Sequence, residues 1–332
     1  MLLAYAKIQL EDEMVETDLP DDPQLGDELL NYFPQRLREK YADGIARHRL
    51  RREIVTTVIA NELVNRAGIT FVHEVRENTG MGVADIARAY IAAREVFNVR
   101  RLWQQVEALD KQGPGRPAVG AAAGMRPRDR ARNDLAFAQR AAAPRDRGDA
   151  VKTYGAGVEA LVAAKGLIAD AERAEIEQRV AKYAEQGVPK ALAQRMAIMH
   201  LLPPSLDIVR IASTTGVPVE QVGRTYFAVG ARFGLDWLRR AAAALPSESH
   251  WDKQAVVAVT DDFYGHQRDL TTRILGTAAK SNGADPIEAW SAARGPAVHR
   301  AASWSPTSAN PAPPALAMLA VANRQLRSLT AG

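Results

Sequence analysis

The side chains that could perform chemistry are scattered along this chain and do not form a recognisable motif. Asp261 and Asp262 are adjacent carboxylates of the kind used in acid–base catalysis. Neighbouring helix positions point in different directions, which favours two solvated carboxylates. His73-Glu74 lacks the second histidine of a zinc-binding helix, and the six histidines are isolated. The chain has no cysteine. We therefore expect no catalytic residue and no metal-ligating residue in this sequence.

A nucleotide site is also absent from the sequence pattern. The glycine-rich run Gly113 to Gly124 follows no predicted strand and is interrupted by Pro114 and Pro117. A dinucleotide fingerprint needs its glycines at a strand-to-helix turn, where the backbone can approach the pyrophosphate. The P-loop pattern does not occur either. We expect this chain to bind no cofactor by itself.

The elements that could position any site are dominated by a repeat. Residues 69–103 and 205–239 align without gaps, and each copy reads as an apolar helix, a Thr-Gly stop, a turn and a second helix. The identical pairs are Thr79/Thr215, Gly80/Gly216, Val83/Val219, Arg88/Arg224, Tyr90/Tyr226, Ala92/Ala228 and Phe97/Phe233. A chain built from duplicated helical hairpins is typical of packing and assembly modules.

Composition and periodicity favour an all-α fold, a helical bundle or array containing this duplicated hairpin. Alanine is abundant and β-branched residues are modest in number. We expect helices at 23–32, at 50–67 with Gly68 as its stop, at 189–201 closed by Pro203-Pro204, at 248–280 as one long or two shorter helices, and at 315–329.

Changes in composition and in hydrophobic periodicity divide the chain into segments. The segment 113–148 is rich in Arg, Pro, Gly and Ala, which predicts a disordered linker of low order. Residues 300–314 lose periodicity in the same way. The expected organisation is an N-terminal helical unit at 1–112, the linker at 113–148, a second helical unit at 149–299, an irregular segment at 300–314 and a terminal helix at 315–332.

Two other functions compete with packing. A helix, turn and helix resembles a DNA-binding motif, and the basic blocks 36–52 and 116–147 could contact nucleic acid. The candidate recognition helices, however, carry Tyr, Phe, Ile, Val and Ala faces that favour burial, so we expect no nucleic-acid partner. Aromatic side chains could instead line a ligand pocket; at helical spacing they usually form core. The residues concerned are Tyr90, Trp103, Tyr226 and Trp237.

No span, export signal or anchor is evident in the opening residues, and we expect a cytoplasmic protein with no membrane partner. The net charge of +4 arises from 43 Lys and Arg against 39 Asp and Glu. A free-standing helical scaffold stays open as a further alternative.

Longer stretches resemble one family. LLAYAKI, LPDDP, YFP, HRLRREIV, LVNRAGITFV, ENTG and REVF are similar to the C-terminal region of the large NAD-specific glutamate dehydrogenases of bacteria, as are ASTTGVPVEQV, FAVGARFGLDWLR and ANRQLRSL. The resemblance implies a parent enzyme that oxidises L-glutamate to 2-oxoglutarate and ammonia with NAD. Its nucleotide domain and catalytic Lys and Asp precede LLAYAKI, so no family site residue maps onto this sequence. The expected partners are that catalytic portion, other subunits, or both.

The resemblance is interrupted twice. Between 113 and 139, and again between 300 and 314, the chain replaces helical sequence of the family with Arg/Pro/Ala-rich sequence. A GC-rich gene read briefly out of frame has this composition. We interpret both intervals as frame-shifted segments, with genuine insertions as the alternative.

Overall fold

The computed structural model describes residues 2–68, 70–110, 151–163, 170–246, 249–278, 285–293 and 315–330. Within these ranges every regular element is a helix or a helical turn, so the all-α prediction is confirmed. The predictions made for 113–148 and 300–314, including the frame-shift interpretation, lie outside the described residues.

The helices form two compact units. The first comprises Met1–Ala156 and Arg179–Pro203, and the second comprises Gly157–Gln178 and Pro204–Gly332. This division differs from the expected order of 1–112 followed by 149–299, because α13 (Lys190–Ala197) packs on α7 (Val99–Asp110) of the first unit. The boundaries predicted from the sequence follow changes in composition and stay a prediction. The compact units follow packing, and each is built from two separate stretches of the chain.

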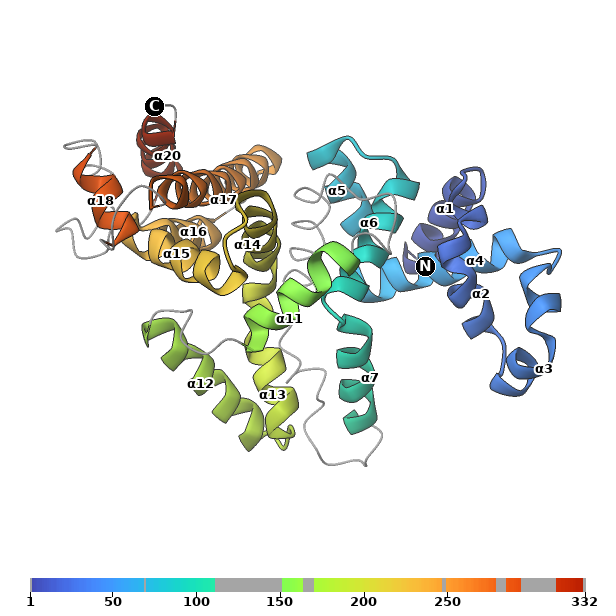
Figure 1. Cartoon of the computed structure of the whole chain (residues 1–332). Coiled ribbons are helices and arrows are strands. Elements are labelled where there is room, and N and C mark those ends of the chain that lie inside the picture. Colours follow the sequence, from blue (N-terminus) through green and yellow to red (C-terminus); the bar gives the residue numbers. More distant parts are fainter. Residues whose placement is uncertain are drawn as a thin grey trace. The chain divides into compact units, whose positions relative to one another are not determined.

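The first unit contains helices α1 to α7, coloured from blue to teal in Figure 1, and the later helix α13. Its elements are α1 (Leu2–Val15), the 3₁₀ turns Leu19–Asp21 and Pro23–Leu25, α2 (Gly26–Tyr32), α3 (Gln35–Ala46), α4 (Arg51–Glu62), a π turn (Leu63–Ala67), α5 (Phe71–Thr79), α6 (Val83–Val96), α7 (Val99–Asp110), a second π turn (Val151–Gly155), α13 and the 3₁₀ turn Met199–Leu201. Helix α12 (Asp170–Glu185) crosses the division between the units.

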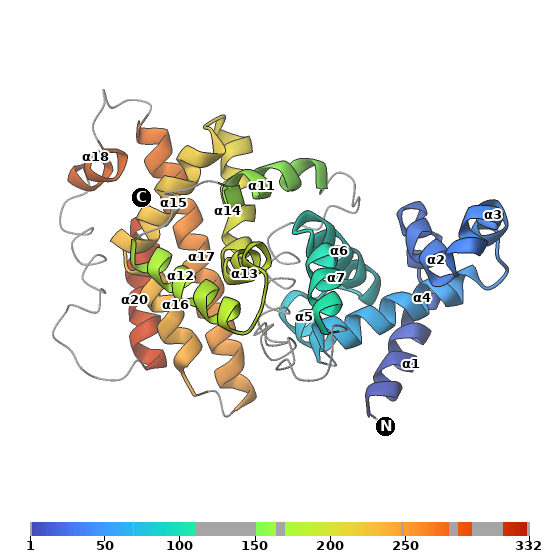
Figure 2. The same ribbon diagram turned by 90° about the horizontal axis from the view of Figure 1, so that it is seen from below.

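The second unit is built around one long helix. Its elements are α11 (Ala156–Ala163), α14 (Leu202–Thr215), α15 (Val219–Arg232), α16 (Leu235–Ala244), α17 (His250–Ala278), α18 (Pro286–Ala292) and α20 (Leu316–Thr330). Helix α17 resolves the open alternative for 248–280 in favour of a single helix, and α20 lies beside it in both views (Figures 1 and 2).

The repeat is confirmed down to single hydrogen bonds. Helices α5 and α14 end at Thr79 and Thr215, and in each the threonine Oγ1 donates to a carbonyl oxygen one turn earlier at 2.7 Å. The glycines that follow, Gly80 and Gly216, both have φ of 71°. That left-handed conformation is readily available only to glycine, which explains the shared Thr-Gly stop.

The repeated unit is longer than the predicted hairpin. After α6 and α15 each copy turns again and starts a third helix, α7 or α16. The second turn needs positive φ at Asn98 (49°) and at Gly234 (65°), which occupy equivalent positions. Phe97 and Phe233 precede these turns and are buried, at 3% and 0% exposure. The sequence thus contains two copies of a three-helix unit, one in each compact unit.

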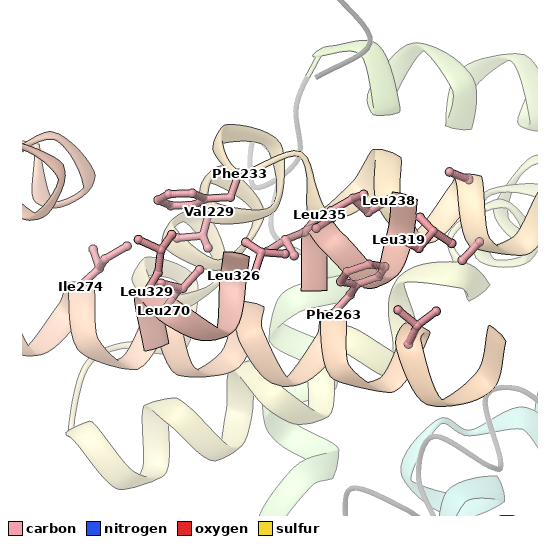
Figure 3. Packing of buried hydrophobic residues seen from close by; sticks show 14 of the residues in the cluster. Val229, Phe233, Leu235, Leu238, Phe263, Leu270, Ile274, Leu319, Leu326 and Leu329 are labelled. Atoms are coloured by element: carbon pink, nitrogen blue, oxygen red, sulfur yellow. The ribbon is translucent and has the colours of Figure 1, made fainter. Parts of the chain in front are cut away.

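The core of the second unit gathers side chains from four helices. Val229 and Phe233 at the end of α15, Leu235 and Leu238 of α16, and Phe263, Leu270 and Ile274 of α17 meet Leu319, Leu326 and Leu329 of α20, as Figure 3 shows. All ten side chains are almost fully buried. Since burial of one such side chain contributes about 1.5–3 kcal/mol, this cluster holds the unit together.

One predicted boundary is wrong. Pro203-Pro204 was expected to close the helix at 189–201, but helix α13 ends at Ala197 and both prolines lie in the first turn of α14. The first backbone N–H groups of a helix have no partner within the helix, so proline is well tolerated there. The prolines therefore begin a helix here.

Candidate functional site

The most buried charge in the first unit is Arg94, within an otherwise apolar stretch of α6. Its side chain is 1% exposed, and ten of the fourteen residues of α6 are buried. The guanidinium donates from Nη2 to Glu28 Oε1 of α2 at 2.6 Å. Its Nη1 donates to Glu62 of α4. An unpaired charge would not be tolerated at this depth, so these carboxylates are required partners.

Two further residues complete the Arg94 cluster, which we define as Glu28, Glu62, Arg94, Glu95 and Arg100. Arg100 Nη2 at the start of α7 lies 2.8 and 2.9 Å from the two oxygens of Glu28. Glu95 accepts from Arg94 Nη2 at 3.0 Å. The cluster therefore joins α2, α4, α6 and α7 through charge-assisted hydrogen bonds.

The Arg94 cluster contains more acidic than basic groups, because three carboxylates share two guanidinium groups. Burial raises the pKa of the Glu62 carboxyl above its ordinary value of 4.5, and the charge of Arg94 only partly opposes this. Burial by itself would lower the pKa of Arg94, but Glu62 and Glu28 outweigh burial and raise it. Arg94 is thus a permanent cation, and Glu62 is a carboxylate that accepts a proton more readily than usual.

A second polar network lies inside the second unit. Asp207 of α14 is 1% exposed and accepts from Arg268 Nη1 of α17 at 3.3 Å and from the Tyr226 hydroxyl of α15 at 3.4 Å. Gln267 Nε2 donates to the Tyr226 carbonyl oxygen at 2.7 Å, and Arg239 Nη1 donates to Gln267 Oε1 at 2.5 Å. We call these five residues the Asp207 network. Its hydrogen bonds connect α14, α15 and α16 to α17.

The two copies of the repeat differ in chemistry at one buried position. The position of Arg94 in the first copy corresponds to Gly230 in the second. A Cβ atom at Gly230 would lie 2.6 Å from Gln267 Nε2 and 2.9 Å from both carboxylate oxygens of Asp236, so a side chain at this position would clash with them. The first copy thus has a charged side chain at this position, whereas in the second copy polar atoms of Gln267 and Asp236 lie next to a glycine.

The carboxylate pair considered from the sequence has a structural role. Asp262 Oδ2 accepts from Asn323 Nδ2 at 2.5 Å and pairs with Arg327 at 3.3 Å. Asn323 Oδ1 in turn lies 2.7 Å from Nε2 of the buried His266. These contacts join α20 to α17. Asp261 also has a polar partner.

The other residues weighed from the sequence do not assemble into a site. His73 lies 3.5 Å from Glu77 on an exposed face. The described residues contain no group of three or more His, Cys, Asp or Glu side chains able to hold a metal. Gly113 to Gly124 lie outside the described residues. Tyr90, Trp103 and Tyr226 are buried, and Trp237 packs against the core of the second unit.

The acidic and basic blocks near the N-terminus are partly used inside the first unit. Arg52 pairs with Asp21 and donates to the carbonyl oxygen of Val15 at 2.6 Å. Arg88 pairs with Asp18 at 2.9 Å and with Asp22 at 3.5 Å. Since α6 is also mostly buried, it cannot present the exposed face that a DNA-recognition helix needs.

Sequence reasoning did not single out Arg94, Glu28, Glu62 or Asp207. A charged residue inside an apolar helical stripe was the available signal, in IAAREVF and in LDIVRI. Their partners on other helices lie 19 to 72 residues away along the chain, and spacing cannot identify such pairs. Among the described residues, no helix has the length and hydropathy to cross a bilayer.

The fold and its buried ion pairs define a class of protein region. It is an all-α region in which buried carboxylates pair with arginines. A family model described as "Glutamate dehydrogenase, C-terminal" matches residues 1–328. The chain is also similar to three bacterial proteins named NAD-specific glutamate dehydrogenase. It is 34% identical to the one from Pseudomonas aeruginosa, over 99% of this chain. It is 32% identical to those from Halomonas elongata and Mycobacterium tuberculosis, over 87% and 99% of this chain.

The chain belongs to the glutamate dehydrogenase C-terminal family. It spans about a fifth of the length of these relatives, at 20%, 18% and 20% of each. The family expected from LLAYAKI and the other quoted motifs is thereby confirmed.

Proposed function

We propose that this chain is the C-terminal helical region of an NAD-dependent glutamate dehydrogenase and that it packs or assembles with the catalytic portion without performing the reaction itself. The observation that carries the proposal is the family match over residues 1–328, combined with relatives about five times as long. In the parent enzyme, L-glutamate, NAD⁺ and water give 2-oxoglutarate, ammonia, NADH and a proton.

The chemistry of the interior supports a non-catalytic role. A catalytic acid, base or nucleophile must reach substrate, and its pKa must suit that task. The buried carboxylates Glu28 and Asp207 are each held by an arginine, and each hydrogen bond joins two helices. Side chains used in this way stabilise packing. The proposal therefore assigns the nucleotide site and the catalytic Lys and Asp to the parent enzyme outside residues 1–332.

The proposed location is the cytoplasm, with other parts of the dehydrogenase as partners and neither nucleic acid nor membrane among them. A cysteine-free chain is compatible with a reducing compartment. NAD belongs to the parent enzyme in this proposal and is not bound by this chain.

Purified chain tests the proposal directly. NAD titration by calorimetry should give no binding heat, and incubation with L-glutamate and NAD should give no NADH absorbance. The same assays on the full-length Pseudomonas aeruginosa relative provide the positive control. NADH formation by the chain alone would contradict the proposal. Co-expression with that relative, shortened by its matching region, should yield a complex on size-exclusion chromatography.

A further inference from the structure

Among the described helices of the first unit, α3 has the largest exposed share of residues. It packs against α2, and in both views it lies at the edge of the unit (Figures 1 and 2). Ten of its twelve residues are exposed, and Ile45 is its single buried residue. An isolated helix shorter than ~12–15 residues is marginally stable in water. Most of the surface of α3 is therefore left uncovered by the residues that the structure describes.

The exposed surface around α3 is apolar at several points. Leu37 and Tyr41 are one helical turn apart, and Tyr32 and Leu50 flank the helix on either side. Their exposures run from 42% to 57%. Eight of the eleven large hydrophobic residues exposed in the described chain fall within the first 50 residues, and these four are half of them. Such a concentration marks an interaction surface more often than scattered single residues do.

The same surface is basic. Residues 32–50, which we call the α3 arm, carry five Lys and Arg against two Asp and Glu. Arg36, Lys40, Arg47 and Arg49 are all exposed. Lys40 Nζ lies 5.2 Å from the centroid of the Tyr41 ring, so cation and aromatic ring form one continuous patch. Aromatic residues and arginine are enriched where protein surfaces meet.

The backbone of α3 is interrupted near its middle. At Tyr41 the chain leaves helical geometry, with φ of −128° and ψ of 28°, which divides the twelve residues into two short pieces. Neither piece is long enough to be stable alone. The apolar, cationic and irregular features therefore coincide at one side chain.

We infer that the α3 arm is a docking surface for an acidic, partly apolar protein surface on the portion of the dehydrogenase that lies outside residues 1–332. This inference rests on the proposed function. Relatives about five times as long provide the additional polypeptide, and the positive charge of the arm selects an acidic partner surface. Leu37 and Tyr41 supply the apolar anchors, and Arg36 and Lys40 supply the charge.

The test uses the intact chain and the Pseudomonas aeruginosa relative shortened by its matching region, co-expressed and then separated for affinity measurement. Two variants alter the arm, L37S/Y41S for the apolar anchors and R36E/K40E for the charge. The matched control is V321S/R324E on α20, where both side chains are also exposed. Each arm variant should bind about tenfold more weakly or worse, as expected for loss of interface anchors, and the control should bind like the unaltered chain.

Other outcomes separate this inference from the proposed function. Equal binding by arm variants and unaltered chain overturns the docking surface but leaves the proposed function intact. Failure of the unaltered chain to bind a shortened relative that still binds NAD contradicts both. Self-association lost only in the arm variants assigns the surface to a second copy, and duplex DNA binding lost only in them assigns it to nucleic acid; either result overturns the inference.

Hydrogen exchange gives a measurement that needs no variant. Amides of 35–46 should exchange rapidly in this chain, and the matching segment should be protected in the full-length Pseudomonas aeruginosa relative. Equally rapid exchange in both proteins would rule out a covered α3.

Discussion

Arg94 shows how a single residue can set the arrangement of four helices. Breaking a buried ion pair costs more than forming it gains, because the remaining charge keeps its desolvation penalty. Glu28 is 2% exposed and has only Arg94 and Arg100 as cationic neighbours in the Arg94 cluster. Removal of one guanidinium therefore leaves its carboxylate under-neutralised in the protein interior.

Arg94→Met should lower the free energy of unfolding by roughly 3–5 kcal/mol, because the buried carboxylates lose their main cation. Arg94→Lys should also be destabilising, since an ammonium cannot reproduce the geometry of the guanidinium bonds. Urea denaturation followed by circular dichroism measures both. Arg101→Met, at an exposed position of α7, is the control and should change the value by less than about 0.5 kcal/mol. Similar small effects at positions 94 and 101 would show that the Arg94 cluster is dispensable.

Glu62 predicts a pH dependence of stability. Its pKa is raised above 4.5 in the folded chain, so the folded state holds this proton more tightly than the unfolded state does. The resulting stabilisation is fully present below pH 4.5 and is lost as the pH rises through the raised pKa. Glu62→Gln cannot ionise and should lack this component.

Unfolding free energies of Glu62→Gln and unaltered chain, measured between about pH 4 and pH 7, should therefore diverge. The variant should gain stability relative to the unaltered chain as the pH rises. Parallel curves would mean that the Glu62 carboxyl titrates alike in both states.

At the scale of elements, the glycine of each Thr-Gly turn in the repeat is required by its backbone conformation. No heavy atom lies within 4 Å of a Cβ built on Gly80 or on Gly216, so substitution there meets no steric obstacle from neighbours. Both residues nevertheless have φ of 71°, where a side chain clashes with its own backbone.

Gly80→Ala and Gly216→Ala should each destabilise the chain by roughly 1–2 kcal/mol. Gly26→Ala is the matched control: its Cβ also meets nothing within 4 Å, but its φ of −55° is helical. That change should be stabilising by about 0.4–1 kcal/mol. Thermal unfolding of the three variants gives the comparison. Three equal effects would show that the left-handed turns are not responsible.

The sequence was sufficient for local elements and insufficient for the polar interior. The periodicity of apolar residues predicted the helices of the repeat, and the Thr-Gly pairs predicted where α5 and α14 end, because these signals depend on neighbours within a few residues. The prediction at Pro203-Pro204 was wrong because a proline pair can either follow one helix or begin the next. Local sequence does not distinguish the two cases, which depend on packing. The pairing of Arg94 with Glu28 spans 66 residues and depends on tertiary contacts.

At the scale of the whole molecule, the first unit needs a late segment of the chain. Helix α13 packs on α7, and Arg195 Nη2 lies 3.3 Å from the carbonyl oxygen of Phe97. A chain truncated after Ala156 lacks α13, whereas one truncated after Pro203 keeps it. The shorter chain should unfold at lower urea concentration, with roughly 2 kcal/mol lost for each apolar side chain that loses its burial. Equal midpoints would show that 179–203 is not required.

The interleaving of the two units has a consequence for inheritance. The chain passes between them three times, after Ala156, Gln178 and Pro203. A single crossover between related genes therefore cannot exchange one intact unit for its counterpart; an exchange would need matched breakpoints at all three junctions. Recombination is expected to transmit both copies of the three-helix unit together. The two copies are therefore expected to have diverged within the same gene.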